Sequence, residues 1–143
     1  MIFLDANIFL RALTQSTDPA IQRMNDSAAN LLRRAERGEL EVTTSDAVIA
    51  EVAFILTARA HYQLAVDDAA GRMAALLRVR GVRLRDKRVI LRALDLWSDI
   101  AKLGFVDALT AAYALQPGIE LASFDSDFDH ISGIVRWRPA DAP

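Results

Sequence analysis

Hydrophobic side chains along the chain follow two spacings. Recurrence every three or four residues predicts helices over residues 7–13, 20 to about 36, 45 or 46 to about 61, 67 or 68 to about 79, 87–103 and 105–115. Short apolar runs between them predict strands over residues 2–4, 40–44, 82–84, 119–124 and 133–137. Strands separated by helices indicate an α/β fold, with a mostly parallel sheet and helices on both of its faces.

Residues at the predicted boundaries support these elements. Pro19 suits the first position of the second helix, and Gly38 suits its C-terminal cap. The chain has no internal repeat and no linker, so residues 1–143 are expected to form a single domain. The last residues, 136–143, are expected to be a frayed tail.

Two predicted strands run directly into acidic residues. Ile2-Phe3-Leu4 shows no alternation, which is typical of a strand buried on both faces, and Asp5 follows it. Asp125 follows the strand at residues 119–124 in the same way. Ligands of open α/β sheets bind at the carboxyl ends of strands, where two neighbouring carboxylates would need protons or cations. The alternative is that each aspartate caps a helix.

Composition sets the broad class of protein. The chain has 143 residues, 52% of them hydrophobic, which fits one globular domain with its own core. No apolar run approaches the roughly 20 residues that span a bilayer, and no signal peptide is expected. The absence of cysteine excludes disulfides and thiolate metal sites and fits the cytoplasm.

Charge is uneven along the chain although the formal net charge is only -2. One basic segment contains Arg78, Arg80, Arg83, Arg85, Lys87, Arg88 and Arg92. This segment is interpreted either as a solvated surface around a short, exposed edge strand at residues 82–84 or as a patch that binds phosphate or a partner.

Two further acids lie on predicted helices. The helical neighbours of Glu51, three and four residues away on either side, are all apolar, so its carboxylate is expected to be at least partly buried. The alternatives are a rim position that reaches solvent or an ion pair with an arginine. Asp107 lies in the first turn of an apolar helix, where the helix macrodipole alone would favour an acid.

As a set, these acids favour metal chemistry. Ligands that offer only oxygen, without nearby cysteine or histidine, select hard cations such as Mg²⁺ or Mn²⁺. Such ions polarise phosphoryl oxygens and activate water in nucleases and phosphatases. Asn7 is suited to orient a ligand carboxylate or to donate a hydrogen bond to a scissile phosphate.

The run Asp125-x-Asp127-x-Asp129 imitates the start of an EF-hand loop. It fails as one, because His130 replaces the required glycine and Arg136 replaces the required glutamate. A strand followed by D-x-D also resembles haloacid-dehalogenase-like phosphatases, whose motif belongs near the N-terminus. A phosphatase is therefore a weak second hypothesis.

Four short motifs occur in a fixed order: Asp5-Ala6-Asn7, Glu51 within residues 45–52, Asp107 within residues 105–108, and Asp125 within residues 123–128. With this order the sequence resembles the PIN-domain ribonucleases, and specifically the VapC-type toxins of toxin–antitoxin pairs. The resemblance covers essentially the whole chain. It implies a compact three-layer α/β/α fold with a central, mostly parallel sheet.

The resemblance also implies an activity, a cofactor and partners. The expected protein is a Mg²⁺- or Mn²⁺-dependent endoribonuclease that cleaves RNA, forms a homodimer and is silenced by a cognate antitoxin. By position, Asp5, Glu51, Asp107 and Asp125 match the family's acidic quartet, and Asn7 matches its polar companion. Asp127 is a plausible secondary metal ligand.

Contacts with RNA and with an antitoxin are expected from other residues. Arg11 and the basic segment could touch the RNA backbone. The predicted helices at residues 20–36 and 45–61 are apolar enough to form a groove for a partner helix, although they could equally pack on the sheet or form the homodimer contact. A hypothesis from a different class is a non-catalytic PIN-like module that binds RNA or protein.

Overall fold

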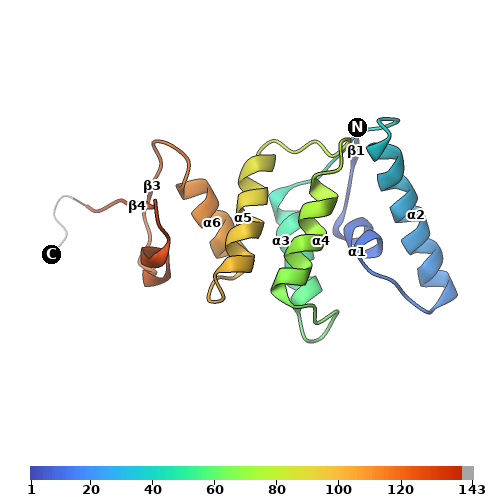
Figure 1. The fold of residues 1–143 in the computed structure, drawn as a ribbon, viewed down its shortest axis with the longest axis horizontal. Helices are drawn as coiled ribbons and strands as arrows, with labels where there is room; N and C mark the ends of the chain where they lie inside the picture. The colour runs from blue at the N-terminus through green and yellow to red at the C-terminus, as the bar shows by residue number, and fades with distance from the viewer. Residues whose placement is uncertain (140–143) are drawn as a thin grey trace. The chain divides into compact units, whose positions relative to one another are not determined.

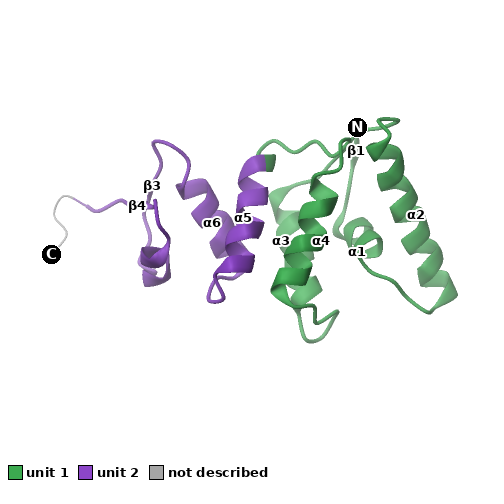
Figure 2. Cartoon of the chain, viewed as in Figure 1, with its two compact units in different colours: residues 1–87 green, residues 88–143 purple. Residues whose placement is uncertain are grey.

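The computed structural model describes residues 1–139 of the chain (Figure 1). The elements are, in order, β1 (Ile2–Phe3), α1 (Ala6–Leu13), α2 (Pro19–Glu36), β2 (Val42–Thr43), α3 (Asp46–Thr57), α4 (Val66–Leu77), α5 (Lys87–Asp99), α6 (Phe105–Ala114), β3 (Glu120–Leu121), the 3-10 helix η1 (Ser126–His130) and β4 (Val135–Arg136). They form two compact units, which Figure 2 colours separately: unit 1, Met1–Lys87, and unit 2, Arg88–Pro143.

Unit 1 is built on a parallel strand pair. Ile2 and Phe3 of β1 lie opposite Val42 and Thr43 of β2. On its other side, β2 makes an isolated parallel bridge between Val42 and Val82. Helix α1 packs against α2 and α3, and α3 packs against α4.

The core of unit 1 consists of side chains from the helices, from β2 and from single residues next to the paired strands. Its largest fully buried residues are Leu4, Val42, Ile49, Val52, Leu56, Leu77 and Val82. Burial of one such side chain stabilises the folded state by roughly 1.5–3 kcal/mol. Residues of β2, α3 and α4 therefore all contribute to this core.

Unit 2 combines two helices with a second parallel strand pair. In this pair, β3 and β4 align Glu120 with Val135 and Leu121 with Arg136. The rings of Trp97 and Phe105 meet edge to face, with centroids 5.5 Å apart and planes at 78°. This contact joins α5 to the start of α6.

The parallel strands and intervening helices confirm the predicted α/β class and are consistent with a three-layer α/β/α fold. Each strand covers two residues and is shorter than predicted. Within residues 1–139, no helix is both long enough and apolar enough to cross a membrane.

Several predicted helix ends shift in the structure. Helix α3 ends at Thr57 instead of near residue 61, because Ala58 adopts an extended conformation with φ -68° and ψ 139°. Helix α5 ends at Asp99 instead of residue 103. Helix α4 begins at Val66 and is preceded by Ala65, so neither Asp67 nor Asp68 is its cap.

Two predictions about strand exposure are wrong. Ile2 and Phe3 are 42% and 60% exposed, whereas only Leu4 of the first apolar run is buried. The continuous apolar run predicts burial on both faces of the strand, but the described chain covers these two side chains only in part. Val82 contributes a single bridge instead of an exposed edge strand, and its side chain is 1% exposed because it belongs to the core.

The end of the chain is ordered slightly further than expected. Arg136 lies in β4, and the backbone amide of Trp137 donates a hydrogen bond of 2.9 Å to the carbonyl oxygen of Leu121. Of the rest of the predicted tail, Arg138 and Pro139 belong to no helix or strand, and residues 140–143 lie outside the described residues.

The close backbone approach beside β2 depends on Gly81. The Val42 amide donates to the Gly81 carbonyl at 2.9 Å. A Cβ atom on Gly81 would lie 2.5 Å from the carbonyl oxygen of Ala35 and 2.7 Å from that of Leu40. These are backbone atoms and cannot rotate away, so the approach requires glycine.

We therefore predict that Gly81→Ala lowers the free energy of unfolding by about 1–3 kcal/mol, the usual cost of overpacking. The matched control is Gly71→Ala in α4, where a Cβ atom would meet nothing within 4 Å. This control should stabilise the protein by about 0.5–1 kcal/mol, because alanine is the better helix former. Urea denaturation measures both changes, and equal stability of the two variants would contradict the prediction.

Candidate functional site

Asp5 follows β1 and begins α1, and its backbone is held on both sides. The Leu4 amide donates to the Thr43 carbonyl at 2.8 Å, and the Thr44 hydroxyl donates to the Leu4 carbonyl at 2.8 Å. The Ile8 amide then donates to the carbonyl of Asp5 at 3.1 Å. These bonds fix the point from which the Asp5 side chain projects.

The Asp5 carboxylate itself is exposed and makes no capping hydrogen bond, although the residue occupies the N-cap position of α1. The structure gives it no hydrogen bond or ion pair within residues 1–139. The capping alternative therefore applies to its backbone but not to its carboxylate. The carboxylate oxygens are free to accept an external ligand.

The far end of α1 is held by a buried asparagine of α2. Asn25 is 5% exposed, and its Nδ2 donates to the carbonyl oxygens of Arg11 at 2.8 Å and Thr14 at 2.6 Å. The Thr14 hydroxyl donates to the Leu10 carbonyl at 2.6 Å. Carbonyls at a helix C-terminus have no partner within the helix, so these side chains satisfy them.

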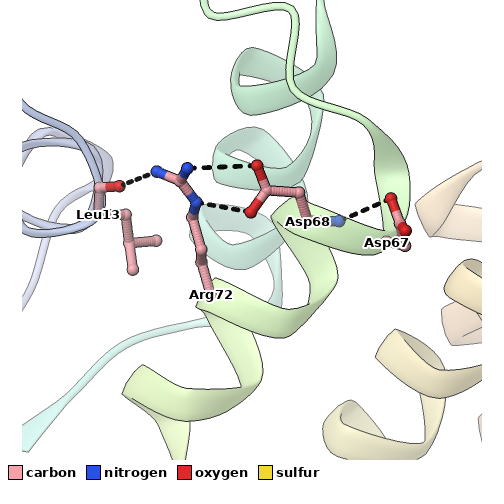
Figure 3. Close-up of polar contacts among 4 residues, drawn as sticks. All are labelled: Leu13, Asp67, Asp68 and Arg72. Carbon is pink, nitrogen blue, oxygen red and sulfur yellow. Dashed lines mark hydrogen bonds and ion pairs between the residues drawn. The ribbon is translucent and has the colours of Figure 1, made fainter.

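Arg72 of α4 satisfies one more carbonyl at this end of α1, as Figure 3 shows. Its Nη1 donates to the Leu13 carbonyl at 2.8 Å, while its Nε and Nη2 bind the two Asp68 carboxylate oxygens at 2.8 and 3.2 Å. The two-point contact with Asp68 orients the guanidinium toward α1. Helix α1 is thus anchored at both ends.

Two predicted site residues, Asn7 and Arg11, line a cavity of about 530 Å³ between α1 and α2. Ile8, Met24 and Leu31 provide apolar walls. The predicted groove was expected on the helices at residues 20–36 and 45–61. The observed cavity uses α2 but pairs it with α1.

Glu51 lies on α3 and is exposed, so the prediction of partial burial is wrong. Helix α3 buries the opposite stripe, Ile49, Val52, Ala53 and Leu56. Phe54, one turn after Glu51, is 69% exposed although it is apolar. The apolar neighbours of Glu51 in the sequence were therefore no indication that its side chain is buried. Its carboxylate reaches solvent and has no partner in the described part of the chain.

In unit 2, Asp107 is half-buried in the first turn of α6. Its side chain has no hydrogen-bond or ion-pair partner among the described residues, and the helix N-terminus favours its negative charge. The preceding Phe105 is buried at 6% exposure and anchors the start of the helix. Asp107 is therefore held at a fixed place with its carboxylate unpaired.

Asp125 differs from the other three acids because it caps a helical turn. Its Oδ1 accepts a hydrogen bond from the Asp127 amide at 2.8 Å, and its own amide donates to the Ser123 hydroxyl at 3.0 Å. The capping alternative thus describes one oxygen of Asp125. Its second oxygen and the half-buried Asp127 carboxylate make no hydrogen bond or ion pair within residues 1–139.

The acids are divided between the two compact units. Asp5 and Glu51 belong to unit 1, and Asp107, Asp125 and Asp127 belong to unit 2. Among the described residues, no group of three or more Asp, Glu, His or Cys side chains is close enough to hold a metal ion. A site that uses all four acids stays a prediction.

The donor chemistry nevertheless suits a hard cation. The carboxylates of Asp5, Glu51 and Asp107 accept no hydrogen bond and no ion pair within the described chain. Unpaired carboxylates that offer only oxygen are the ligands that Mg²⁺ and Mn²⁺ prefer.

The basic segment is partly used for structure. The Arg83 guanidinium pairs with Glu41 at 3.0 Å, and the Lys87 ammonium donates to the Val82 carbonyl at 2.8 Å. Burial, and secondarily the positive charge of Arg83, lowers the pKa of Lys87. Arg85, by contrast, is exposed, as is its neighbour Arg88. Arg83 and Lys87 therefore have structural contacts, whereas binding of phosphate or a partner by the exposed residues of this segment stays a prediction.

Sequence reasoning missed Asn25 and Arg72, which hold the helix that carries Asn7. A signal for Asn25 was present: it is a polar residue between Ile21 and Ala28 on the apolar stripe of α2. Arg72 gave no such signal, because an arginine four residues after an aspartate is ordinarily a surface ion pair.

The sequence was compared with protein families and with curated proteins. The model of the family described as "PIN domain" matches residues 2–134, which include all the candidate acids. No curated protein matches the chain.

The anchoring of α1 yields a prediction. Asn25→Ala should lower the free energy of unfolding by roughly 2–4 kcal/mol, because it removes the donor to the carbonyl of Arg11 in α1 and to that of Thr14, the C-cap residue, in a part-buried place. Asn30→Ala on the same helix, where the side chain is exposed, should change it by less than about 0.5 kcal/mol. Denaturant unfolding would refute the role of Asn25 if the two variants were equally stable.

Proposed function

The chain belongs to the PIN domain family, and we propose that it is a divalent-metal-dependent endoribonuclease that hydrolyses RNA phosphodiester bonds. PIN domains are in general nucleases that need divalent metals and act on RNA or other nucleic acid. The observation that carries the proposal is the set of unpaired carboxylates at Asp5, Glu51 and Asp107 within the matched region, in the order that the family motifs require.

The proposed metal ligands are Asp5, Glu51, Asp107 and Asp125, with Asp127 as a secondary ligand. The cation, Mg²⁺ or Mn²⁺, would supply an activated water and positive charge beside the scissile phosphate. Because the Asp127 amide occupies Oδ1 of Asp125, this ligand would use its second oxygen.

The chain's own groups have distinct tasks in the proposed reaction. The Asp5 carboxylate is presented by a backbone that three hydrogen bonds hold, which limits the reorganisation needed when ligands bind. The Asn7 amide, on the first turn of the anchored α1, would orient a ligand carboxylate or donate to the phosphate. Arg11, one turn further along, would contact the RNA backbone.

We further propose that the protein is the toxin of a toxin–antitoxin pair of the VapC type and acts in the cytoplasm as a homodimer. The cavity between α1 and α2 is a suitable place for an antitoxin segment. Met24 is 48% exposed at this cavity, and its apolar walls lie beside the Asn7 and Arg11 side chains. A helix or strand bound here would cover the same residues that would contact RNA, which accounts for silencing.

The nuclease proposal predicts RNA cleavage that needs Mg²⁺ or Mn²⁺ and stops in EDTA. Asp5→Asn and Asp107→Asn should each lower kcat/KM at least about a hundredfold, which corresponds to ~2.7 kcal/mol of lost transition-state stabilisation. Asp95→Asn, which changes an exposed acid of α5 outside the motifs, should cleave like the wild type. The assay follows cleavage of labelled RNA by gel electrophoresis.

Cleavage that survives EDTA and both substitutions would refute the nuclease proposal. The non-catalytic alternative predicts a different result. No cleavage would be seen at all, and the substitutions would raise the melting temperature by relieving repulsion between idle acids. Hydrolysis of a chromogenic phosphate ester, without RNA cleavage, would favour the phosphatase.

The toxin proposal predicts that expression of the wild-type chain arrests bacterial growth and that Asp5→Asn, at matched expression, does not. Co-expression of the antitoxin, expected from a small open reading frame beside the gene, should restore growth. Met24→Asp should prevent this rescue by placing a charge in the apolar cavity. Val66→Asp, a similar change at an exposed residue of α4, should leave rescue intact. Normal growth without any antitoxin would contradict the toxin role.

A further inference from the structure

Unit 2 contains a cavity of about 540 Å³ beside the strand pair β3–β4. Its walls are residues 122–124, which follow β3, and residues 136–139, at and after β4, together with Asp129. Two hydrogen bonds tie these walls together. The Trp137 amide donates to the Leu121 carbonyl at 2.9 Å, and Nη2 of Arg136 donates to the Ser123 carbonyl at 2.7 Å. The cavity is therefore part of the folded unit.

Two aromatic rings at this cavity have no partner in the described chain. Phe124 is fully exposed and Trp137 is 51% exposed, and neither makes a ring contact with a described residue. In the same unit, Trp97 and Phe105 are 4% and 6% exposed and pack against each other. Large exposed aromatics that line one cavity indicate a binding surface, because their burial would otherwise stabilise the fold.

The same cavity carries excess positive charge. Arg136 and Arg138 line it against one acid, Asp129, whose Oδ1 lies 3.6 Å from Nε of Arg136. The Arg136 side chain is 19% exposed, and its Nη1 is buried without a hydrogen-bond partner in residues 1–139. Its charge is thus fixed at the wall, and Arg138 is exposed to solvent.

We propose that Phe124 and Trp137 form a stacking platform for the bases of single-stranded RNA, with Arg136 and Arg138 attracting its phosphates. Aromatic faces accept any base, and neighbouring arginines neutralise the backbone, which is the usual combination for single-stranded nucleic acid. The identity of the ligand as RNA rests on the proposed function. Phe124 directly precedes Asp125 in the sequence, so the residue on which a base would stack is next to a proposed metal ligand.

The platform assigns a role to residues that the nuclease proposal does not use. A polyanion-binding patch would need the arginines but not the rings. A duplex would present its phosphates but keep its bases stacked on one another. Base stacking therefore differs from simple attraction of charge in two ways. It needs the aromatic rings, and it needs RNA whose bases are unpaired.

The test measures binding by full-length Asp107→Asn protein in EDTA, so that RNA stays intact. A short single-stranded RNA should quench tryptophan fluorescence, because Trp137 is exposed and Trp97 is buried. Trp137→Phe should abolish the quenching. Phe124→Ala should raise Kd about tenfold, whereas Ile119→Ala, an exposed apolar residue of the same unit outside the cavity, should change Kd by less than about twofold.

Three results would overturn the platform: quenching that survives Trp137→Phe, equal effects of Phe124→Ala and Ile119→Ala, or equal quenching by single-stranded RNA, duplex RNA and heparin. Circular dichroism confirms that the variants fold. The outcome is independent of the cleavage assay. If RNA quenches the fluorescence but the wild type does not cleave RNA, the platform is supported and the nuclease proposal is rejected. If the wild type cleaves RNA but Phe124→Ala binds it as tightly as the unsubstituted protein, the nuclease proposal is supported and the platform is rejected.

Discussion

The interaction on which unit 1 depends is the parallel pairing of β1 with β2. Two-residue strands offer few hydrogen bonds, so the pair gains support from a side chain: the Thr44 hydroxyl donates to the Leu4 carbonyl at 2.8 Å. Leu4 is buried at 1% exposure while the next residue, Asp5, is exposed. The chain therefore passes from core to solvent within one residue, and the strand pair determines where the first acid emerges.

A second constraint acts through α1. An eight-residue helix is too short to be stable alone, and its four terminal carbonyls would be costly to leave unsatisfied. Side chains from three different places supply the missing donors: Thr14 after α1, Asn25 of α2 and Arg72 of α4. Packing of α1 thus depends on tertiary contacts at both ends. The same contacts fix Asn7 and Arg11 beside the cavity between α1 and α2.

The sequence predicted the elements better than their exposure. Periodicity located each α-helix of residues 1–139, because a 3.6-residue repeat persists over many positions, but not the short 3-10 helix η1. Pro19 marked the first residue of α2 as expected. Burial of Glu51 and of Ile2-Phe3 was predicted wrongly, since local apolar neighbours do not reveal which face another element covers. The order of the acids could be read from the chain, whereas their distances depend on long-range packing that no local pattern encodes.

The exposure of Glu51 changes the argument for its role without removing it. A buried, ionised carboxylate requires a permanent partner. If Glu51 had been buried with no partner in the protein, a bound metal ion would have been implied. An exposed carboxylate costs little when unpaired, so its lack of a partner alone is weak support. Stronger support comes from Asp5. It occupies the N-cap position of α1, but its side chain makes no capping hydrogen bond. A helix start normally uses such an oxygen, and leaving it free is a cost that an external ligand would offset.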